Sequence, residues 1–359
     1  MITKTIIITG SHHTPAIELI NQLKNDSYHW QINYIGDVFK SETHLTNTII
    51  PDHEINFYQL TSGKFHRRWL PDTIRGIPKT LAALISSFKL VSTIKPDIII
   101  SFGGYVSVPI IIAGSLLKIP TITHEQTLTN SLSTKINSLF ATKVALSFEE
   151  PNQIKQLPSK KVVVTGNLLR SDIFKIASSK YRHLESTIKK YPLIYITGGA
   201  QGSSAINQTI TKIIPSLSAK YTIIHHCGKL EYDLIKSQLT SMSHYIPTDY
   251  VGLDDIGWVL HNADIVISRS GVNTCQEIVA LHKKSILIPL PFSQQNEQLL
   301  NAQWVKKWLP KTTIIIDQNQ LSANTLLESI DQLAKTKSIH PPKTAIANNL
   351  VLKLIHELI

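Results

Sequence analysis

The chain has 359 residues, of which 42% are hydrophobic and 17% charged, a balance that favours two buried cores and excludes a disordered protein. Its two cysteines, Cys227 and Cys275, exclude a disulfide framework and fit a reducing compartment. The net charge of +11 indicates an anionic partner: nucleic acid, a phosphorylated substrate or an acidic bilayer. Without a signal peptide or an apolar run of about 18 residues, we expect a soluble, cytosolic protein.

Short apolar runs alternate with segments of helical spacing along the chain. Strands are predicted at residues 5–9, 31–35, 97–102, 120–123, 143–148, 161–165, 193–197, 221–226, 264–268, 285–290 and 313–317. Helical spacing follows in segments such as 204–217 and 273–282. Strands that are apolar on both faces and separated by helices are typical of parallel sheets covered on both sides. We therefore predict an α/β protein with two doubly wound, Rossmann-like parallel-sheet domains.

The turn TGNLLRSDIF at residues 165–174 indicates the domain boundary, with a first domain at 1–165 and a second at 166–340. Residues 341–359 are expected to form a C-terminal helix. Its apolar stripe consists of Ile346, Leu350, Val351, Leu354, Ile355 and Leu358. An amphipathic helix of this kind buries its stripe on a folded domain.

The first turn, ITGSHHTPA at residues 8–16, leads from a strand into a helix. Its backbone N–H groups and the positive helix end suit a phosphate or another anion. His12 at the tip is a candidate general base, because an unperturbed pKa of about 6.5 suits proton transfer near neutral pH. On the turn alone, a capping or surface histidine is an equal alternative. We expect His13 to have no chemical role.

Two further turns of the first half follow predicted strands. SFGGYVSVP at residues 101–109 carries Gly103 and Gly104, which permit close approach of the backbone to a ligand or merely make a tight turn. ITHEQTLTN at residues 122–130 places polar side chains at the carboxyl end of a buried strand. Ligands bind at such strand ends in open α/β sheets, although a solvated loop would show the same polarity.

The second half contains a comparable set. TGGAQGSSA at residues 197–205 forms a turn able to approach a diphosphate closely. Glu277, early in the helix after SRSG, is placed to accept hydrogen bonds from two ribose hydroxyls, or simply stabilises a helix N-terminus. Because all these turns follow strands, we expect them on the same edges of their sheets.

In order, the motifs TGSH…P, GGYVSVP, HEQ, GNLLR, GGAQG…N, SRSG…T..E and NEQ…NA resemble those of the MurG family of N-acetylglucosaminyltransferases, which convert lipid I to lipid II in peptidoglycan synthesis. The resemblance covers roughly residues 5 to 305. It implies an inverting, metal-independent transferase of GT-B architecture, with two domains facing a cleft and no cofactor. The first domain would receive the lipid acceptor, the second would bind UDP-N-acetylglucosamine, and the last helix would return to the first domain.

The resemblance also implies a role for individual positions. His12 would be the catalytic base. Donor contacts would be Thr9, Gly10, Ser11, Thr127, Arg170, Gly199, Ala200, Leu253, Thr274, Glu277 and Gln298. Acceptor contacts would be Gly103, Gly104, Tyr105, His124, Glu125 and Gln126. Arg170 would lie near the donor phosphate and Glu277 at the ribose, while the turn carrying His12 would hold the acceptor diphosphate.

The chain departs from the family's usual residues in several of these motifs. The departures are Ile8, Ser11, Thr127, Ala200 and Glu297. Two alternatives stay open: a transferase or epimerase for another UDP-sugar on the same scaffold, and a non-catalytic, membrane-associated binding protein. The ordered acceptor motifs disfavour an epimerase, which has no lipid acceptor.

Residues 64–91 combine cations with an apolar stripe at helical spacing. The cations are Lys64, Arg67, Arg68, Arg75, Lys79 and Lys89, and the apolar residues are Trp69, Leu70, Leu81, Leu84, Ile85 and Phe88. This composition is typical of an interfacial anchor on anionic lipid, although the stripe could equally be the core face of a helix. With the implied polyprenyl acceptor, we expect a peripheral protein on the cytoplasmic face of the inner membrane. Nucleic acid is not an expected partner, and the oligomeric state stays open.

Overall fold

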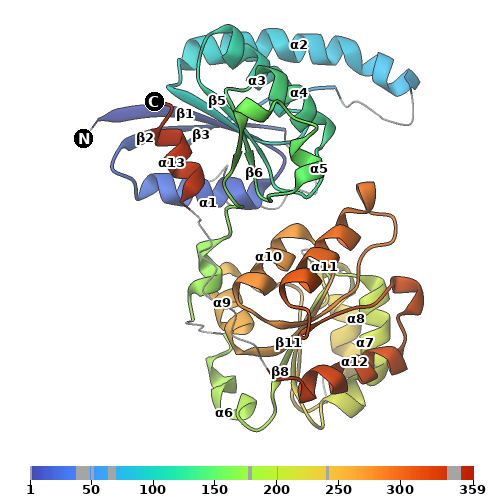
Figure 1. Cartoon of the computed structure of the whole chain (residues 1–359). Helices are drawn as coiled ribbons and strands as arrows, with labels where there is room; N and C mark the ends of the chain where they lie inside the picture. Colours follow the sequence, from blue (N-terminus) through green and yellow to red (C-terminus); the bar gives the residue numbers. More distant parts are fainter. Residues whose placement is uncertain are drawn as a thin grey trace. The chain divides into compact units, whose positions relative to one another are not determined.

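The computed structural model describes residues 2–37, 49, 52–63, 70–176, 180–199, 201–239, 242–337 and 349–359, without the side chains of residues 70–77 and 294. The chain forms two compact units (Figure 1). The first unit comprises Met1–Arg170 together with Ile346–Ile359, and the second comprises Ser171–Ala345. The boundary therefore falls within the turn at residues 165–174, directly after Arg170.

The described residues of the first unit form a parallel sheet in the order β3-β2-β1-β4-β5-β6-β7. Its strands are β1 (Thr3–Gly10), β2 (His29–Gly36), β3 (Ile55–Gln59), β4 (Ile98–Phe102), β5 (Thr121–Glu125), β6 (Lys143–Leu146) and β7 (Val162–Val164). The chain builds outward from β1 to β3 and then from β4 to β7 on the other side, so strand order reverses between β1 and β4. In open sheets of this kind, ligands bind beyond the carboxyl ends of the strands at such a reversal.

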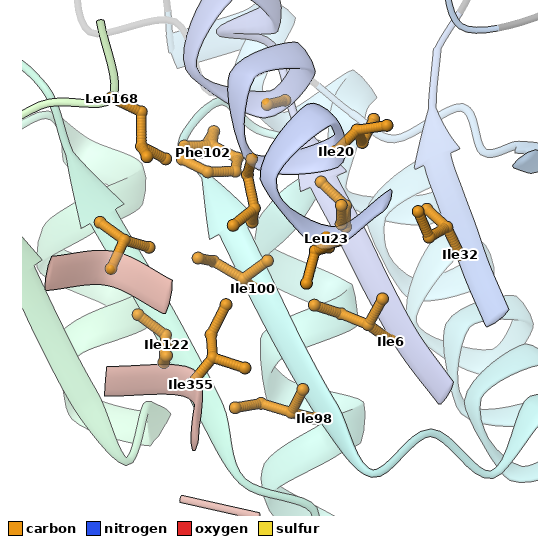
Figure 2. Packing of buried hydrophobic residues seen from close by; sticks show 14 of the residues in the cluster. Ile6, Ile20, Leu23, Ile32, Ile98, Ile100, Phe102, Ile122, Leu168 and Ile355 are labelled. Carbon is orange, nitrogen blue, oxygen red and sulfur yellow. The ribbon is translucent and has the colours of Figure 1, made fainter. Parts of the chain in front are cut away.

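Helices cover both faces of this sheet. They are α1 (His13–Lys24), α2 (Leu70–Ile94), α3 (Ser107–Leu116), α4 (Leu132–Phe140), α5 (Pro151–Ile154) and α13 (Leu350–His356). Side chains of a strand alternate between faces, so Ile6 packs with α1 and α13 whereas Ile7 packs with α2 and α3. Figure 2 shows Ile355 of α13 among the strand residues Ile98 and Ile122. The last helix thus completes the core of the first unit.

The described residues of the second unit form a parallel sheet in the order β10-β9-β8-β11-β12-β13, which reverses between β8 and β11. Its strands are β8 (Leu193–Thr197), β9 (Thr222–His226), β10 (Tyr245–Thr248), β11 (Ala263–Ser268), β12 (Lys284–Leu287) and β13 (Thr313–Ile315). Its helices are α6 (Glu185–Ile188), α7 (Ser204–Leu217), α8 (Lys229–Leu239), α9 (Leu253–Asn262), α10 (Val272–Ala280), α11 (Glu297–Trp308) and α12 (Ala323–Lys335). α7, α8 and α12 share one core cluster with the strands.

The predicted fold class is confirmed, and every predicted strand overlaps an observed one. Two strands, β3 and β10, were not predicted, and both lie at a sheet edge. The predicted strand at 285–290 was too long, because β12 ends at Leu287. Of the predicted C-terminal stripe, Val351, Leu354 and Ile355 are buried, and Ile346 lies outside the described residues. No helix in the described ranges is long and apolar enough to cross a membrane.

Candidate active site

In the first unit, the turns after β1 and β4 meet at the point where strand order reverses. The backbone N–H of Ser11 donates to Gly103 O at 3.2 Å, and that of His12 donates to Phe102 O at 3.4 Å. Parallel neighbouring strands end at the same edge, so these bonds join two segments about 90 residues apart in sequence. The two turns therefore form one surface.

Glycines allow these turns to touch. Gly10 has φ +132°, and a Cβ there would lie 2.6 Å from the carbonyl carbon of Phe102. Gly104 has φ +80°, and a Cβ there would overlap Ser11 Oγ. Any larger residue would separate the turns or strain the backbone. The predicted close approach at Gly104 is therefore made first of all by the protein's own turn.

His12 is the N-cap residue that directly precedes α1, but its side chain makes no capping hydrogen bond. Burial lowers the pKa of His12 below the ordinary histidine value, and the nearby charge of Glu125 opposes part of that shift. The ring is thus neutral at physiological pH and able to accept a proton. His13 instead bonds Tyr34 OH through Nδ1 at 3.0 Å, while that hydroxyl lies 3.1 Å from Gly10 O, so His13 supports the turn.

Glu125, at the end of β5, is 2% exposed, and its carboxylate is fully engaged by its own chain. Oε1 accepts from the backbone N–H of Thr127 at 3.2 Å and lies 2.9 Å from its hydroxyl. Oε2 accepts from the backbone N–H of Ser131 at 3.0 Å and from the hydroxyl of Thr134 at 2.7 Å. Glu125 therefore fixes the loop between β5 and α4 and adds negative charge beside His12.

The other expected acceptor residues lie at the same edge. His124 is 1% exposed, and burial lowers its pKa to about 4, so its neutral ring donates from Nε2 to Gly166 O at 3.1 Å. Tyr105 OH donates to Asp37 Oδ2 at 3.3 Å. Gln126 is buried, and its Oε1 has no hydrogen-bond partner among the described residues. A buried amide oxygen without a partner favours a polar ligand here.

In the second unit, two helices begin at the strand reversal. α7 follows the glycine turn after β8, and α10 follows the SRSG turn after β11. Neither helix has a side-chain cap or an acidic residue in its first turn. Gly199 has φ +86°, and its N–H donates to Thr197 Oγ1 at 3.1 Å. Two uncapped helix N-termini at adjacent strand ends present backbone N–H groups to an anion.

The glycine turn rests on a buried network that includes the carboxylate of Glu231, which accepts from Asn207 Nδ2 at 2.8 Å. The ring nitrogens of His225 lie 3.0 Å from Asn207 Oδ1 and 2.9 Å from Tyr245 OH. Asn207 Nδ2 donates to Cys227 O at 2.9 Å. Burial, with a contribution from His226, lowers the pKa of His225 to about 3, so the ring stays uncharged. This network holds the first turn of α7 against β9.

The structure distributes the expected site residues between the two units. The first unit carries Thr9, Gly10, Ser11, His12, Gly103, Gly104, Tyr105, His124, Glu125, Gln126, Thr127 and Arg170. The second unit carries Gly199, Leu253, Thr274, Glu277 and Gln298, and Ala200 lies outside the described residues. Glu277 is 3% exposed on α10, and Gln298 Oε1 accepts from the backbone N–H of Leu290 at 3.0 Å.

Sequence reasoning did not select Arg269, although it stands inside the SRSG motif. Its side chain bonds Ser203, Ile288 and Gln318, which lie 66, 19 and 49 residues away in sequence. No local pattern signals such contacts. Among the described residues, no group of three or more His, Cys, Asp or Glu side chains is placed to hold a metal ion.

Comparison with known proteins decides the family. Residues 4–146 match the glycosyltransferase family 28 N-terminal domain, and residues 193–358 match the family 28 C-terminal domain. A relative from Clostridium novyi (strain NT) is 33% identical over 358 residues, which cover 98% of this chain and 96% of the relative. The chain belongs to glycosyltransferase family 28. That relative is named UDP-N-acetylglucosamine--N-acetylmuramyl-(pentapeptide) pyrophosphoryl-undecaprenol N-acetylglucosamine transferase.

Further comparisons agree with this family 28 assignment. A relative with the same name and the suffix 2, from Bacillus thuringiensis subsp. konkukian (strain 97-27), is 33% identical over 96% of this chain and 94% of its own. Among solved structures, Acinetobacter baumannii MurG superposes with a TM-score of 0.69 at 21% identity over 99% of both chains. Neisseria meningitidis UDP-GlcNAc 2-epimerase, bound to UDP-GlcNAc, has a TM-score of 0.63 at 16% identity over 99% of both chains. These two structures share the fold.

Proposed function

We propose that this protein transfers N-acetylglucosamine from UDP-N-acetylglucosamine to lipid I, the muramyl-pentapeptide pyrophosphoryl-undecaprenol acceptor, and so makes lipid II for peptidoglycan. The observation that carries the proposal is the 33% identity to curated transferases of that name across both units. An epimerase shares the fold at only 16% identity and needs no acceptor turn. The interlocked turns of the first unit, with a neutral histidine among them, fit an enzyme that receives a second substrate.

In this proposal the second unit stabilises the leaving group. Breakage of the bond between the sugar and UDP places negative charge on the diphosphate, which fixed hydrogen-bond donors stabilise. The N-termini of α7 and α10 and the N–H groups of the turn at Gly199 supply such donors. Glu277 of the second unit accepts hydrogen bonds from the ribose hydroxyls, and Arg170, the last residue of the first unit before the boundary, adds a cation.

The first unit would hold and activate the acceptor. The acceptor hydroxyl oxygen attacks the anomeric carbon of the sugar with inversion, UDP departs, and the hydroxyl proton passes to His12. The lowered pKa of His12 keeps its ring ready to accept that proton at neutral pH. Gly103 places no side chain against the His12 ring, and Gly104 lets its turn lie against Ser11, so the two joined turns would receive the acceptor diphosphate.

A transfer assay tests this proposal directly. Purified protein is incubated with lipid I and UDP-N-acetylglucosamine labelled in the sugar, and labelled lipid and free UDP are both measured. We expect equal amounts of lipid II and UDP, and formation of both products slowed by roughly 10²–10⁴-fold in the His12→Ala variant. Release of a labelled epimer without lipid labelling would identify an epimerase, and binding of UDP without turnover would identify a non-catalytic protein.

We further propose that α2 contacts the anionic lipid of the cytoplasmic leaflet, where the acceptor resides. The helix buries Ala83 and Val91 and exposes three apolar side chains at helical spacing: Leu81, Ile85 and Phe88 are 57%, 73% and 42% exposed. These three residues are therefore not a core face. The cations Lys79 and Lys89 are exposed on the same helix, which suits peripheral attachment.

Vesicle sedimentation tests the lipid contact. The variant Ile85→Ser, Phe88→Ser should bind phosphatidylglycerol vesicles at least tenfold more weakly than the unmodified protein, since each side chain contributes roughly 1.5–3 kcal/mol on burial. Leu230→Ser, Leu234→Ser is the matched control, because these residues of α8 are 94% and 60% exposed in the second unit. An equal loss of vesicle binding in both variants, or no loss in either variant, would contradict a contact through α2. The expected residues 64–69 lie outside the described part of the chain.

A further inference from the structure

Arg269, directly after β11, is half-buried and surrounded by neutral acceptors. Its Nε donates to Ser203 Oγ at 3.1 Å. One terminal nitrogen donates to Ile288 O at 3.1 Å and lies 3.4 Å from Pro289 O, and the other donates to Gln318 Oε1 at 2.6 Å. The planar guanidinium thus donates hydrogen bonds to three separate segments of the chain.

No carboxylate of the described residues forms an ion pair with this guanidinium. Burial lowers the pKa of Arg269, and no acidic neighbour opposes that shift. A cation removed from water without a counter-charge is unfavourable, so such groups are normally paired with an anion. No charge among the described residues of the second unit therefore balances this cation.

Arg269 and its partners lie on the segments that follow four neighbouring strands. Ser203 precedes α7 after β8, and Arg269 itself follows β11 and precedes α10. Ile288 and Pro289 follow β12 and lead toward Gln298. Gln318 lies in the short 3₁₀ helix after β13. One side chain therefore links both uncapped helix N-termini to the segment that carries an expected donor contact.

We propose that Arg269 is the positioning residue of the donor site: it holds the starts of α7 and α10 and the segment from Ile288 to Gln298 in one arrangement, and its unbalanced charge is completed by the bound diphosphate. This inference rests on the proposed function. The positioning acts through hydrogen bonds, and the electrostatic attraction acts over a longer distance on an anion at the helix N-termini. The nucleotide is thus recognised partly by a cation whose hydrogen bonds all go to groups of its own chain.

Gln318 offers a way to separate charge from geometry. The variant Gln318→Glu keeps an oxygen for Arg269 and cancels its charge. Gln320→Glu is the matched control, because Gln320 is an exposed residue of the same 3₁₀ helix and its side chain makes no hydrogen bond to Arg269. We expect calorimetry at low salt to show about tenfold weaker UDP binding for Gln318→Glu, equal to about 1.4 kcal/mol, and less than twofold for Gln320→Glu. Added salt should reduce the difference in UDP affinity between the two variants.

Arg269→Lys tests the positioning, because lysine keeps the charge and loses the fork. In the protein without ligand, hydrogen exchange should become faster in residues 201–206 and 288–298 and stay unchanged in the first unit. Wild-type UDP affinity in Gln318→Glu, equal weakening in Gln320→Glu, or unchanged exchange in Arg269→Lys would overturn the inference. Tight UDP binding by the unmodified protein without transfer to lipid I would instead overturn the proposed function and leave the role of Arg269 intact.

Discussion

The ring of His12 lies against Gly103: a Cβ at residue 103 would come within 3.2 Å of His12 Cδ2 and 3.4 Å of Nε2. Gly103→Ala should therefore displace the ring by a few tenths of an ångström and lower kcat for transfer about tenfold, because small misplacements of a catalytic group are costly. UDP affinity should not change. Gly166→Ala is the control, since Gly166 has a similar φ of +73° and nothing within 4 Å of its added Cβ. Equal kcat in the two variants would contradict the role of this contact.

The pH dependence of transfer should report the neutral ring of His12. Because burial lowers its pKa, kcat/KM should fall on the acid side with a midpoint below the ordinary value of about 6.5. His12→Ala should remove this limb and lower kcat by roughly 10²–10⁴-fold with UDP affinity nearly unchanged. An acid limb that persists in His12→Ala would assign the base to another group.

Glu125→Gln should loosen the loop between β5 and α4. Both carboxylate oxygens accept from backbone N–H groups, of Thr127 and of Ser131, so an amide would place its NH₂ against one of those donors. Losing a charge-assisted bond and opposing two donors should cost about 1.5–3 kcal/mol of unfolding free energy. Urea unfolding measures the loss, and hydrogen exchange should locate it at residues 127–134. Unfolding and exchange identical to the unmodified protein would show that the carboxylate charge is dispensable there.

Glu277→Ala should weaken donor binding without unfolding the second unit. If the carboxylate accepts the ribose hydroxyls, its loss costs about 1.5–3 kcal/mol, or roughly ten- to hundredfold in the Kd for UDP. Calorimetry with UDP checks the affinity, and a thermal melt checks the fold. Affinity for UDP equal to that of the unmodified protein would remove Glu277 from the site.

Because His225 is buried as a neutral ring, we expect the second unit to lose stability in acid. Its pKa is about 3 in the folded protein and about 6.5 when unfolded, so below pH 6.5 the unfolded chain binds a proton that the folded one does not. The unfolding free energy should therefore fall by about 1.4 kcal/mol per pH unit from this group between pH 6 and pH 4. His225→Phe should be less stable at pH 7 but lose less stability on acidification. Parallel urea midpoints for the two proteins across this range would contradict the prediction.

The strands that sequence alone predicts are those built from continuous runs of apolar and β-branched residues, including the edge strands β7 and β13. β8 was predicted at its observed bounds because its five residues are apolar or threonine and all buried. β3 and β10 were missed because each is a short edge strand with mixed polarity, and β10 contains Pro247, which only an edge readily accepts. An apolar run signals a strand even at an edge, and neither β3 nor β10 has a run that its polar residues or proline do not interrupt.

The features of the site likewise divide into those that sequence predicts and those that it does not. Glycine turns after buried strands can be found from sequence, because backbone conformation requires glycine there, as at Gly10 and Gly104. The roles of the polar side chains at those turns cannot be found from sequence, because they depend on partners that are distant in the chain. The carboxylate of Glu125 binds its own loop, and Arg269 joins segments separated by up to 66 residues.

The return of α13 to the first unit sets an order of events during synthesis. The core around Ile98 and Ile122 is built from residues up to Leu168 and from Val351, Leu354 and Ile355. Those strands keep apolar surface in water until residues 350–356 have been made. The second unit is one continuous stretch, Ser171–Ala345, and has its whole core before α13 emerges from the ribosome. The half of the molecule that is translated first is therefore the half that closes last, and during that interval it is the part most in need of a chaperone.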